Sequence, residues 1–233
     1  MDGNGRWALR RGLPRIAGHR AGVEAVRRVV SRAPEMGIDR LTLYAFSSDN
    51  WRRPTAEVQS IFWLLRAFLR LETNRLRAQG VRLQAIGRRD RIPMAALRAI
   101  KEAERATASC HRLELCVAID YSSRDAITRA AASIIEAELG MTPRHLLYPR
   151  LAQVLAGQSR DVDLLIRTGG EKRLPDFLLW EYAYAEFVFT DRMWLDFDGV
   201  DLEAALQEFK RRDRRFGALP LIVATQDSAL CAE

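Results

Sequence analysis

The sequence predicts a single α/β domain in which a mostly parallel central sheet is flanked by helices. Short apolar segments rich in β-forming residues alternate along the chain with longer segments of helical periodicity. This order is typical of parallel strands with helices on both faces. The 233 residues, 48% of them hydrophobic, are enough for one large core. No repeat, low-complexity stretch or long linker divides residues 1–233, so we expect one domain.

The first half of the chain shows this alternation clearly. Valines at helical spacing predict a helix over 20–36, which Gly37 ends. The apolar run at 41–46 predicts a buried strand, and a polar loop follows it at 47–54. A long helix is then expected over 55–79.

The second half continues the pattern, with strands that lead into polar loops. Asp201 is a candidate N-cap for the last helix, because an aspartate side chain can accept a hydrogen bond from a free backbone N–H of the first turn. Strands are expected at 81–86, 113–119, 162–166 and 186–190, and helices at 93–109, 123–139, 143–156 and from Leu202 to Phe216.

The helix over 55–79, which Gly80 ends, is apolar on more than one side. Such a helix must bury more than one side. One interpretation is that the helix lies in the middle of the core or at a dimer interface. The other is that it forms a wall of a hydrophobic cleft. One stripe contains Val58, Ile61, Leu65, Phe68 and Leu76, and the further apolar residues are Phe62, Trp63, Leu64 and Leu69.

The net charge of +7, in which arginine dominates the cations, narrows the range of partners. The sequence has no run of basic residues interleaved with aromatic ones, so phosphate-bearing small substrates are favoured over nucleic acid. Transient contact with a membrane surface is left open. No apolar run approaches the ~20 residues that cross a bilayer, and we expect a soluble, cytoplasmic protein. Cys110, Cys116 and Cys231 fit neither a disulfide framework nor a zinc site.

The first residues combine side chains suited to a diphosphate and a divalent cation. Asp2 can hold a hard metal through oxygen. Gly3 and Gly5 let the backbone approach a ligand. Arg6 and Arg15 can fork onto phosphate oxygens. The alternative is a flexible N-terminus that carries a few charges.

A second polar stretch follows the fourth expected strand. Gly169 and Gly170 can form a backbone nest for an anion, with Arg167 and Arg173 on either side. The alternative is an ordinary strand-to-helix turn with exposed charges. Glu186 begins the fifth strand and is either a second carboxylate near the metal or a surface charge. Because ligands bind at the carboxyl ends of parallel strands, these polar stretches can converge on one edge.

Several segments in order along nearly the whole chain resemble the cis-prenyltransferase family. Agreement of separate segments in both order and spacing is not expected by chance. The segments are MDGNGRWA at Met1–Ala8, GH at Gly18–His19, LTLYAFSSDNWRRP at Leu41–Pro54, IRTGGEKR at Ile166–Arg173, FLLWEYAYAEFVFT at Phe177–Thr190 and RRDRRFG at Arg211–Gly217.

The resemblance implies the family's parallel sheet with flanking helices and a hydrophobic tunnel, in a homodimer. The implied reaction is the Mg²⁺-dependent condensation of isopentenyl diphosphate with an allylic diphosphate, which builds a Z double bond at each step. We expect a long polyprenyl diphosphate that serves as a cell-wall lipid carrier. Ala45, small at a position that faces the tunnel in relatives, is compatible with a long chain.

The resemblance also implies roles for individual residues. Asp2 is the essential carboxylate and binds Mg²⁺, with Glu186 as a second ligand, and Asn50 lies where the proton is removed. The residues that hold the allylic diphosphate are Gly3, Asn4, Gly5, Arg6, Arg15 and His19, with Trp7 among them. The loop over the reaction centre contributes Ser47, Ser48, Asp49, Trp51 and Arg53. Isopentenyl diphosphate is bound by Arg167 and Arg173, and Arg215 and Gly217 reach the neighbouring subunit's site.

Three departures from the family pattern bear on these expectations. Family members carry an apolar strand just before the Met-Asp-Gly motif. That strand is missing from the given chain, and we expect the upstream codons to encode it. Pro175, next to Leu174 in the substrate loop, replaces a serine that hydrogen-bonds isopentenyl diphosphate, and proline offers neither hydroxyl nor N–H. Ser122 and Ser123 replace two glycines, and serine is less permissive at positive φ, so we expect an altered turn.

Two other functions remain open. A short-chain or irregular Z-prenyl diphosphate synthase would fit the changes at Pro175 and at 122–123. A non-catalytic partner subunit of a heteromeric synthase would lack the catalytic aspartate and the diphosphate-binding residues. Asp2, Arg6 and Arg167 are present, so the enzyme is favoured.

Overall fold

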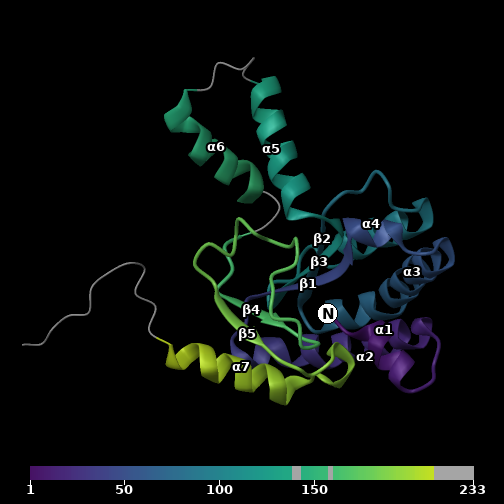
Figure 1. Ribbon diagram of the computed structural model, residues 1–233. Helices are drawn as coiled ribbons and strands as arrows, with labels where there is room; N and C mark the ends of the chain where they lie inside the picture. The colour runs from purple at the N-terminus through teal and green to yellow at the C-terminus, as the bar shows by residue number, and fades with distance from the viewer. Residues whose placement is uncertain (138–142, 157–159, 213–233) are drawn as a thin grey trace, which may run out of the picture.

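Two sets of parallel strands form the centre of the protein (Figure 1), as described by a computed structural model of residues 1–137, 143–156 and 160–212. The first sheet has the strand order β1-β3-β2, and the second pairs β4 with β5. All of these pairings are parallel. The strands are β1 (Arg40–Ser47), β2 (Val81–Ile86), β3 (Leu113–Tyr121), β4 (Leu164–Arg167) and β5 (Glu186–Phe189).

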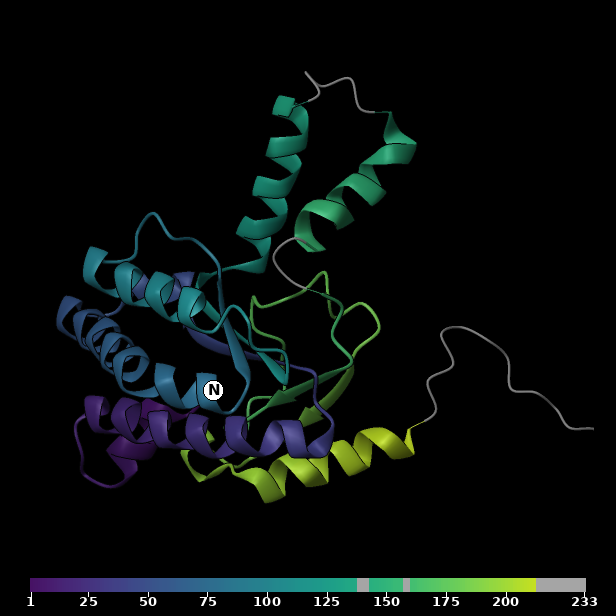
Figure 2. The same ribbon diagram turned by 180° about the vertical axis from the view of Figure 1, so that it is seen from behind.

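Helices lie around these strands. Helices α2 and α3 run alongside each other next to the first sheet (Figure 2), and α7 contacts α2. Helices α5 and α6 project together from the body in both views. The helices are α1 (Asn4–Arg10), α2 (Arg15–Arg32), α3 (Thr55–Ala78), α4 (Met94–Ala106), α5 (Ser123–Ala137), α6 (Arg144–Ala156) and α7 (Gly199–Arg211), with short 3₁₀ helices η1 (Ala33–Met36), η2 (Ser48–Arg52) and η3 (Trp194–Asp196).

The predicted α/β fold with parallel strands flanked by helices is confirmed, and the glycine signals are accurate. Gly37 and Gly80 follow η1 and α3 with φ values of 76° and 72°, which L-amino acids with a side chain rarely adopt. The N-terminal segment differs from expectation because it forms helix α1. Gly3 turns the chain into this helix at φ 93°, and its C=O accepts a hydrogen bond from the Trp7 N–H at 2.8 Å.

The predicted start of the last helix is wrong by three residues. Its N-cap is Asp198, whose side chain accepts hydrogen bonds from the N–H groups of Val200 and Asp201. Asp201 is the third helical residue and completes a capping box by accepting from the Asp198 N–H. Asp198, three residues before the predicted cap, therefore takes the capping position.

The two sheets face each other across a polar cavity. No pairing joins β1 to β4 among the described residues. Consecutive residues of both segments line the cavity between them, 37–45 on one side and 160–168 on the other, together with Met1. The strand expected before Met1 stays a prediction.

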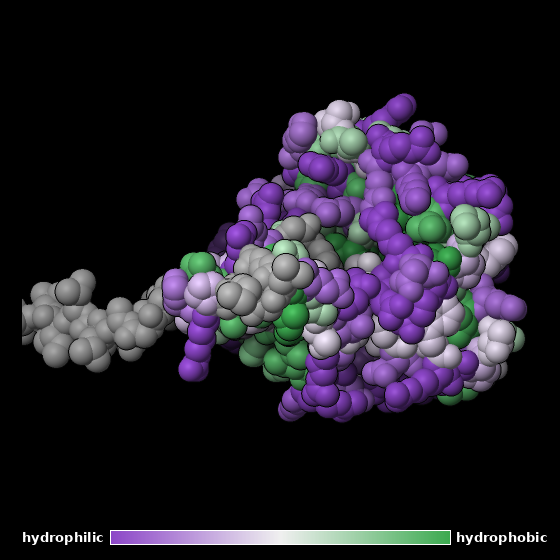
Figure 3. Space-filling model, turned by 90° about the horizontal axis from the view of Figure 1, so that it is seen from above, coloured by the Kyte–Doolittle hydropathy of each residue, from purple (hydrophilic) through white to green (hydrophobic). Residues whose placement is uncertain are grey.

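The core centres on β3, which has a neighbouring strand on each side. The side chains of Leu113, Leu115 and Ile119 in this strand are at most 2% exposed. Most of the face seen from above is hydrophilic, with hydrophobic residues in patches between the polar side chains (Figure 3). Within the described part of the chain, no helix has both the length and the apolar character to cross a membrane.

A glycine sets the distance between α1 and α2. A Cβ at Gly18 would lie 2.0 Å from the backbone oxygen of Asn4, so a side chain there forces the two helices apart. Glycine to alanine normally stabilises a helix interior by about 1 kcal/mol. We expect the opposite sign for Gly18→Ala, a loss of about 1–3 kcal/mol in the free energy of unfolding from overpacking. Urea denaturation measures this, and an unchanged or raised stability would contradict the close contact.

Candidate active site

Asp2 is fixed at the carboxyl end of β4 through its backbone. Its N–H donates to Thr168 Oγ1 at 3.1 Å, and its C=O accepts from the Trp194 N–H at 3.0 Å. Thr168 directly follows β4. The chain start and the polar loop after β4 therefore meet at one sheet edge.

The Asp2 carboxylate lies between two guanidinium groups. Arg167 Nη2 donates to Oδ2 at 3.1 Å, the Gly3 N–H donates to Oδ1 at 2.7 Å, and Arg6 Nη2 lies 3.6 Å from Oδ1. Partial burial raises the pKa of Asp2, but the hydrogen bonds from Arg167 and from the Gly3 N–H outweigh it and hold the pKa below its ordinary value. The acid is therefore ionised at neutral pH and keeps two arginines beside it.

The loop after β4 has the backbone that an anion nest requires. Gly169 and Gly170 have φ values of 89° and 80°. A Cβ at Gly169 would lie 3.1 Å from Arg6 Nη2 and 3.3 Å from the Asp2 backbone, so only glycine lets these groups approach. The alternative of a strand-to-helix turn is wrong, because turns lead from here to β5.

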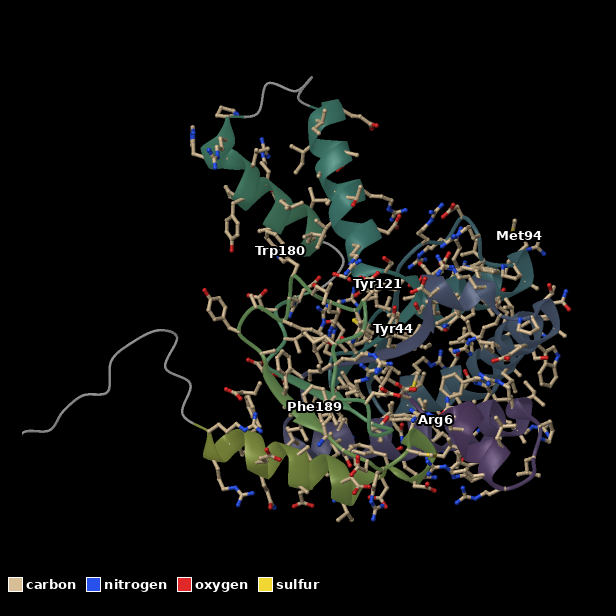
Figure 4. All side chains as sticks on the ribbon, in the orientation of Figure 1. Arg6, Tyr44, Met94, Tyr121, Trp180 and Phe189 are labelled. Carbon is tan, nitrogen blue, oxygen red and sulfur yellow. The ribbon has the colours of Figure 1, made fainter. Side chains whose placement is uncertain are left out.

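Arginine side chains surround this loop and are held by a glutamate. Arg167 donates a second hydrogen bond to the Arg173 carbonyl oxygen, and Arg173 pairs with Glu171. Arg6 Nη1 lies 3.6 Å from Glu171 Oε1. Figure 4 shows Arg6 at the inner end of α1, next to the strands of the second sheet. Two predicted phosphate-binding arginines, Arg6 and Arg167, thus lie beside Asp2, and Arg173 joins them through Glu171.

Glu57, in the first turn of α3, gathers a second group of cations. Its carboxylate lies 3.2 Å from Arg15 Nε, 3.0 Å from Arg53 Nη1 and 3.3 Å from His19 Nε2. Burial lowers the pKa of His19, although Glu57 opposes this. Burial raises the pKa of Glu57, but His19 and the two arginines outweigh it and leave the pKa below its ordinary value. Sequence reasoning missed Glu57, whose only signal was its place just after the polar loop.

The loop between β1 and α3 turns only some of its predicted residues toward the polar cavity. Asn50 Oδ1 accepts from the Ser47 N–H at 3.1 Å, and Ser47 Oγ accepts from the Asp49 N–H at 3.1 Å. These hydrogen bonds form a capping box that fixes η2. The predicted loop residues that line the cavity are Ser47, Asp49, Asn50 and Arg53, and those that do not are Ser48 and Trp51.

Ser48 and Trp51 instead bind Asp120, at the end of β3. Ser48 Oγ donates at 3.0 Å and Trp51 Nε1 at 2.9 Å to Oδ1, and Arg91 Nε donates to Oδ2 at 2.8 Å. Asp120 is fully buried and has a φ of 50°, which is uncommon for a residue other than glycine. This strained acid ties the loop to the sheet, so Ser48 and Trp51 act from behind the site.

The serine pair next to Asp120 has a different effect from the expected one. Neither serine has a positive φ, so these two positions need no glycine-like conformation. Ser122 Oγ donates to Asp176 Oδ2 at 2.6 Å, and Ser123 Oγ accepts from the Leu179 N–H at 2.9 Å. The serines thus hold the segment that follows Pro175, a residue that lines the polar cavity.

An apolar cavity extends from this site between the first sheet and helices α2 and α3. Its volume is about 120 Å³, which is below the ~300–1,000 Å³ typical of ligand sites. Met1, Asn4 and His19 line both cavities, so the two join at the cationic end. This is the predicted hydrophobic tunnel, and α3 forms its wall. The α3 residues that line it are Ile61, Leu64, Leu65, Phe68 and Leu69, and Ala45 lines it from β1.

Within one chain, Glu186 is not brought to Asp2. Glu186 begins β5 beside Leu164, whereas Asp2 lies past the other end of β4. Three residues of strand separate these levels, or about 10 Å. The Glu186 carboxylate pairs with Arg212 Nη1 at 2.7 Å. Its role as a second metal ligand stays a prediction that this geometry does not support.

Trp7 and Leu174 also lie outside both cavities. Trp7 Nε1 donates to Asp196 Oδ1 at 3.1 Å, and the Arg11 guanidinium stacks 4.1 Å from its ring centroid. Leu174 is 39% exposed. The predicted contribution of Arg215 and Gly217 falls outside the described residues.

Comparison with known proteins agrees with this site. The family described as "Putative undecaprenyl diphosphate synthase" matches residues 1–217. "Isoprenyl transferase 1" of Bradyrhizobium diazoefficiens is 55% identical over 99% of this chain and 92% of its own length. "Isoprenyl transferase" of Aquifex aeolicus is 45% identical over 93% of both chains. The structure of lavandulyl diphosphate synthase from Lavandula x intermedia, in complex with dimethylallyl diphosphate, superimposes with a TM-score of 0.88 at 32% identity, covering 93% of this chain and 95% of that one.

The parallel α/β fold, the cationic cavity and the tunnel define a prenyltransferase. The match over residues 1–217 places the chain in the cis-prenyltransferase family, whose curated members are isoprenyl transferases. The resemblance read from the sequence motifs is thereby confirmed.

Removal of the buried Asp120 carboxylate tests the anchoring of the catalytic loop. Asp120→Ala leaves the Arg91 guanidinium and the Trp51 N–H without their acceptor, and we expect it to lower the free energy of unfolding by about 3–5 kcal/mol. Asp120→Asn keeps an acceptor for Trp51 and should cost clearly less. Urea denaturation compares the two. Equal stability of wild type and Asp120→Ala would contradict the anchoring role.

The Asp2 pKa predicts a pH dependence of stability. Because the pKa is lowered on folding, the ionised acid contributes stability above its unfolded value of 3.8, and this is lost as the pH falls through the lowered folded value. The stability difference between wild type and Asp2→Asn should therefore shrink as the pH falls below about 5 and through 3.8 toward the lowered folded pKa. Urea denaturation at a series of pH values measures it. A difference that grows toward acid pH would be incompatible with the pairing to Arg167.

Proposed function

We propose that this chain is a Mg²⁺-dependent cis-prenyltransferase that condenses isopentenyl diphosphate with an allylic diphosphate and forms a Z-polyprenyl diphosphate. One observation carries the proposal. The cavity that gathers Asp2 and the arginines opens directly into an apolar tunnel. Such a site suits substrates with a diphosphate head and a hydrocarbon tail.

Two cation groups bind the two diphosphates in this proposal. Arg6, Arg15 and His19 hold the allylic diphosphate, and Arg167 and Arg173 hold isopentenyl diphosphate. Charge-assisted hydrogen bonds to phosphate are the strong ones, and arginine forms them in pairs. The cations lie around Asp2 and Glu57 before any substrate arrives. The charge that develops on the departing diphosphate therefore meets donors that are already oriented.

Asp2 is the residue that we propose as the Mg²⁺ ligand. No cluster of three or more His, Cys, Asp or Glu occurs in the described part of the chain. A single carboxylate nevertheless fits, because Mg²⁺ is usually bound through one or two carboxylates together with substrate phosphates. The bound ion would neutralise the leaving diphosphate. Arg6 and Arg167, which now pair with Asp2, are then free to bind phosphate oxygens.

The condensation also requires a group that accepts the proton lost from isopentenyl diphosphate. The allylic carbon–oxygen bond breaks with its electron pair leaving on diphosphate, the double bond of isopentenyl diphosphate attacks that carbon, and a proton leaves to form the new Z double bond. Asn50 lines the cavity, but its Oδ1 already accepts from the Ser47 N–H. An amide is not among the usual general bases. We therefore assign Asn50 to orienting the substrate, with a diphosphate oxygen as the proton acceptor.

The tunnel receives the growing chain. Each CH₂ group moved from water into it is favourable by about 0.8 kcal/mol, so elongation proceeds into the apolar space. A long polyprenyl diphosphate, usable as a cell-wall lipid carrier, is the product that we propose. The second candidate, a short-chain or irregular synthase, is favoured by the likeness to lavandulyl diphosphate synthase and by Pro175.

A homodimer is part of the proposal. Large apolar side chains are exposed on the projecting α5–α6 pair and near β5, and exposed apolar patches mark interaction surfaces. They are Ile135, Leu146, Leu147, Tyr148, Tyr184 and Phe189.

Product analysis with labelled isopentenyl diphosphate tests the function. The purified protein with Mg²⁺ and an allylic primer should incorporate label into extractable prenyl diphosphates, and chelation of Mg²⁺ should stop it. Asp2→Ala should lower incorporation by about 10²–10³-fold, the range seen when a charge-stabilising group is lost, without unfolding the protein. Arg10→Ala, an exposed arginine that lines neither cavity, is the matched control. Absence of labelled product with every primer would refute the proposal.

A further inference from the structure

Ion pairs join α2 and α3 at two places, with the apolar tunnel between them. The first, His19 with Glu57, lies at the mouth beside the arginines. The second, Arg27 with Glu72, lies eight residues further along α2 and fifteen further along α3. The proposed reaction uses the first pair and assigns nothing to the second.

The second pair is close, and its carboxylate is largely removed from water, whereas the Arg27 side chain is 31% exposed. Arg27 Nε donates to Glu72 Oε1 at 2.9 Å, and Arg27 Nη2 lies 2.6 Å from the same oxygen. Glu72 is 7% exposed. Arg75, on the same helix as Glu72, is 3.9 Å from its other oxygen. A carboxylate buried to this degree requires its partner, so separation of the helices here is unfavourable.

The pair lies at the end of the tunnel opposite the mouth. Val26, directly before Arg27, and Leu69, one turn before Glu72, both line the tunnel. His19 and Ile61 line it toward the other end of the same two helices. The tunnel wall between α2 and α3 thus runs from one ion pair to the other.

The side chains that line the tunnel between these pairs leave a gap between the two helices. They face empty space, and Val23, Val26, Leu65 and Phe68 are only partly buried. An apolar contact at the far end would also yield easily, because a growing hydrocarbon chain replaces it with an equivalent one. An ion pair does not, because a hydrocarbon cannot satisfy the separated charges.

We propose that the Arg27–Glu72 pair is a latch that closes the far end of the tunnel and thereby limits product length. The latch rests on the proposed elongation activity. While it is closed, α2 and α3 stay together and the product ends where the tunnel ends. Once it is removed, the helices separate at that end and the chain extends between them.

Neutral substitutions test the latch. Glu72→Gln keeps size and one acceptor but loses the charge, and Arg27→Gln removes the guanidinium. We expect both to shift the product distribution toward longer chains by at least one isoprene unit. The rate of the first addition should stay within about twofold, because the mouth is untouched. Arg27→Lys keeps the charge and should restore the wild-type lengths.

Glu24→Gln is a matched control on the same arginine. Glu24 Oε2 accepts from Arg27 Nη1 at 2.7 Å, but both residues belong to α2, so its loss does not unlink the helices. We expect no change in product length. Thermal unfolding of each variant shows that the protein remains folded.

The assay uses labelled isopentenyl diphosphate with farnesyl diphosphate as primer and reports total incorporation and chain length separately. Normal incorporation with unchanged or shorter products in Glu72→Gln would overturn the latch and leave the proposed function intact. Longer products in Glu24→Gln would overturn it as well. No incorporation by the wild-type protein would refute the proposed function and the latch together.

Discussion

The ion pair between Asp2 and Arg167 is the contact on which the rest of the site depends. Positive side chains gathered for diphosphates repel one another until the substrates arrive. Two carboxylates supply the opposing charge. Asp2 lies between Arg6 and Arg167, and Glu57 pairs with Arg15, Arg53 and His19. The chain therefore folds with its phosphate-binding groups already in place. Because both acids pair with several cations, a phosphate can take over some of these contacts without leaving any acid unpaired.

The same arrangement of an acid on a rigid element and donors on a loop recurs behind the site. Asp120 lies one residue before the end of the central strand β3, and its carboxylate holds a loop that its own capping box also fixes. Figure 4 places Tyr44 and Tyr121 near each other at this edge, and Tyr44 Oη donates to the Tyr121 carbonyl oxygen at 3.0 Å. The loop is thus held from the sheet side and faces the cavity with its remaining residues.

Periodicity and glycine placement predicted the strands, most helices and the edge at which the polar stretches meet, because these features follow from local sequence. Two features did not follow. Helix α1 depends on Gly3 and on contact with α2 at Gly18, both of which need the tertiary fold. Ser48 and Trp51 turn inward because they donate hydrogen bonds to Asp120, which lies 72 and 69 residues further along the chain. A local sequence pattern does not predict which loop residues will contact a residue that is distant in the sequence.

Helix α3 is apolar on more than one side because it contacts both the core and the tunnel. Val58, Phe62, Leu69 and Leu76 are buried in the core, and Ile61, Leu64, Leu65 and Phe68 line the tunnel, so one helix serves two apolar environments. A helix that borders a void loses packing contacts on that side. It needs other contacts to hold it in place, and the acids at 57 and 72 provide them toward α2. The polar residues of α3 are therefore as much a requirement of the tunnel as the apolar residues that line it.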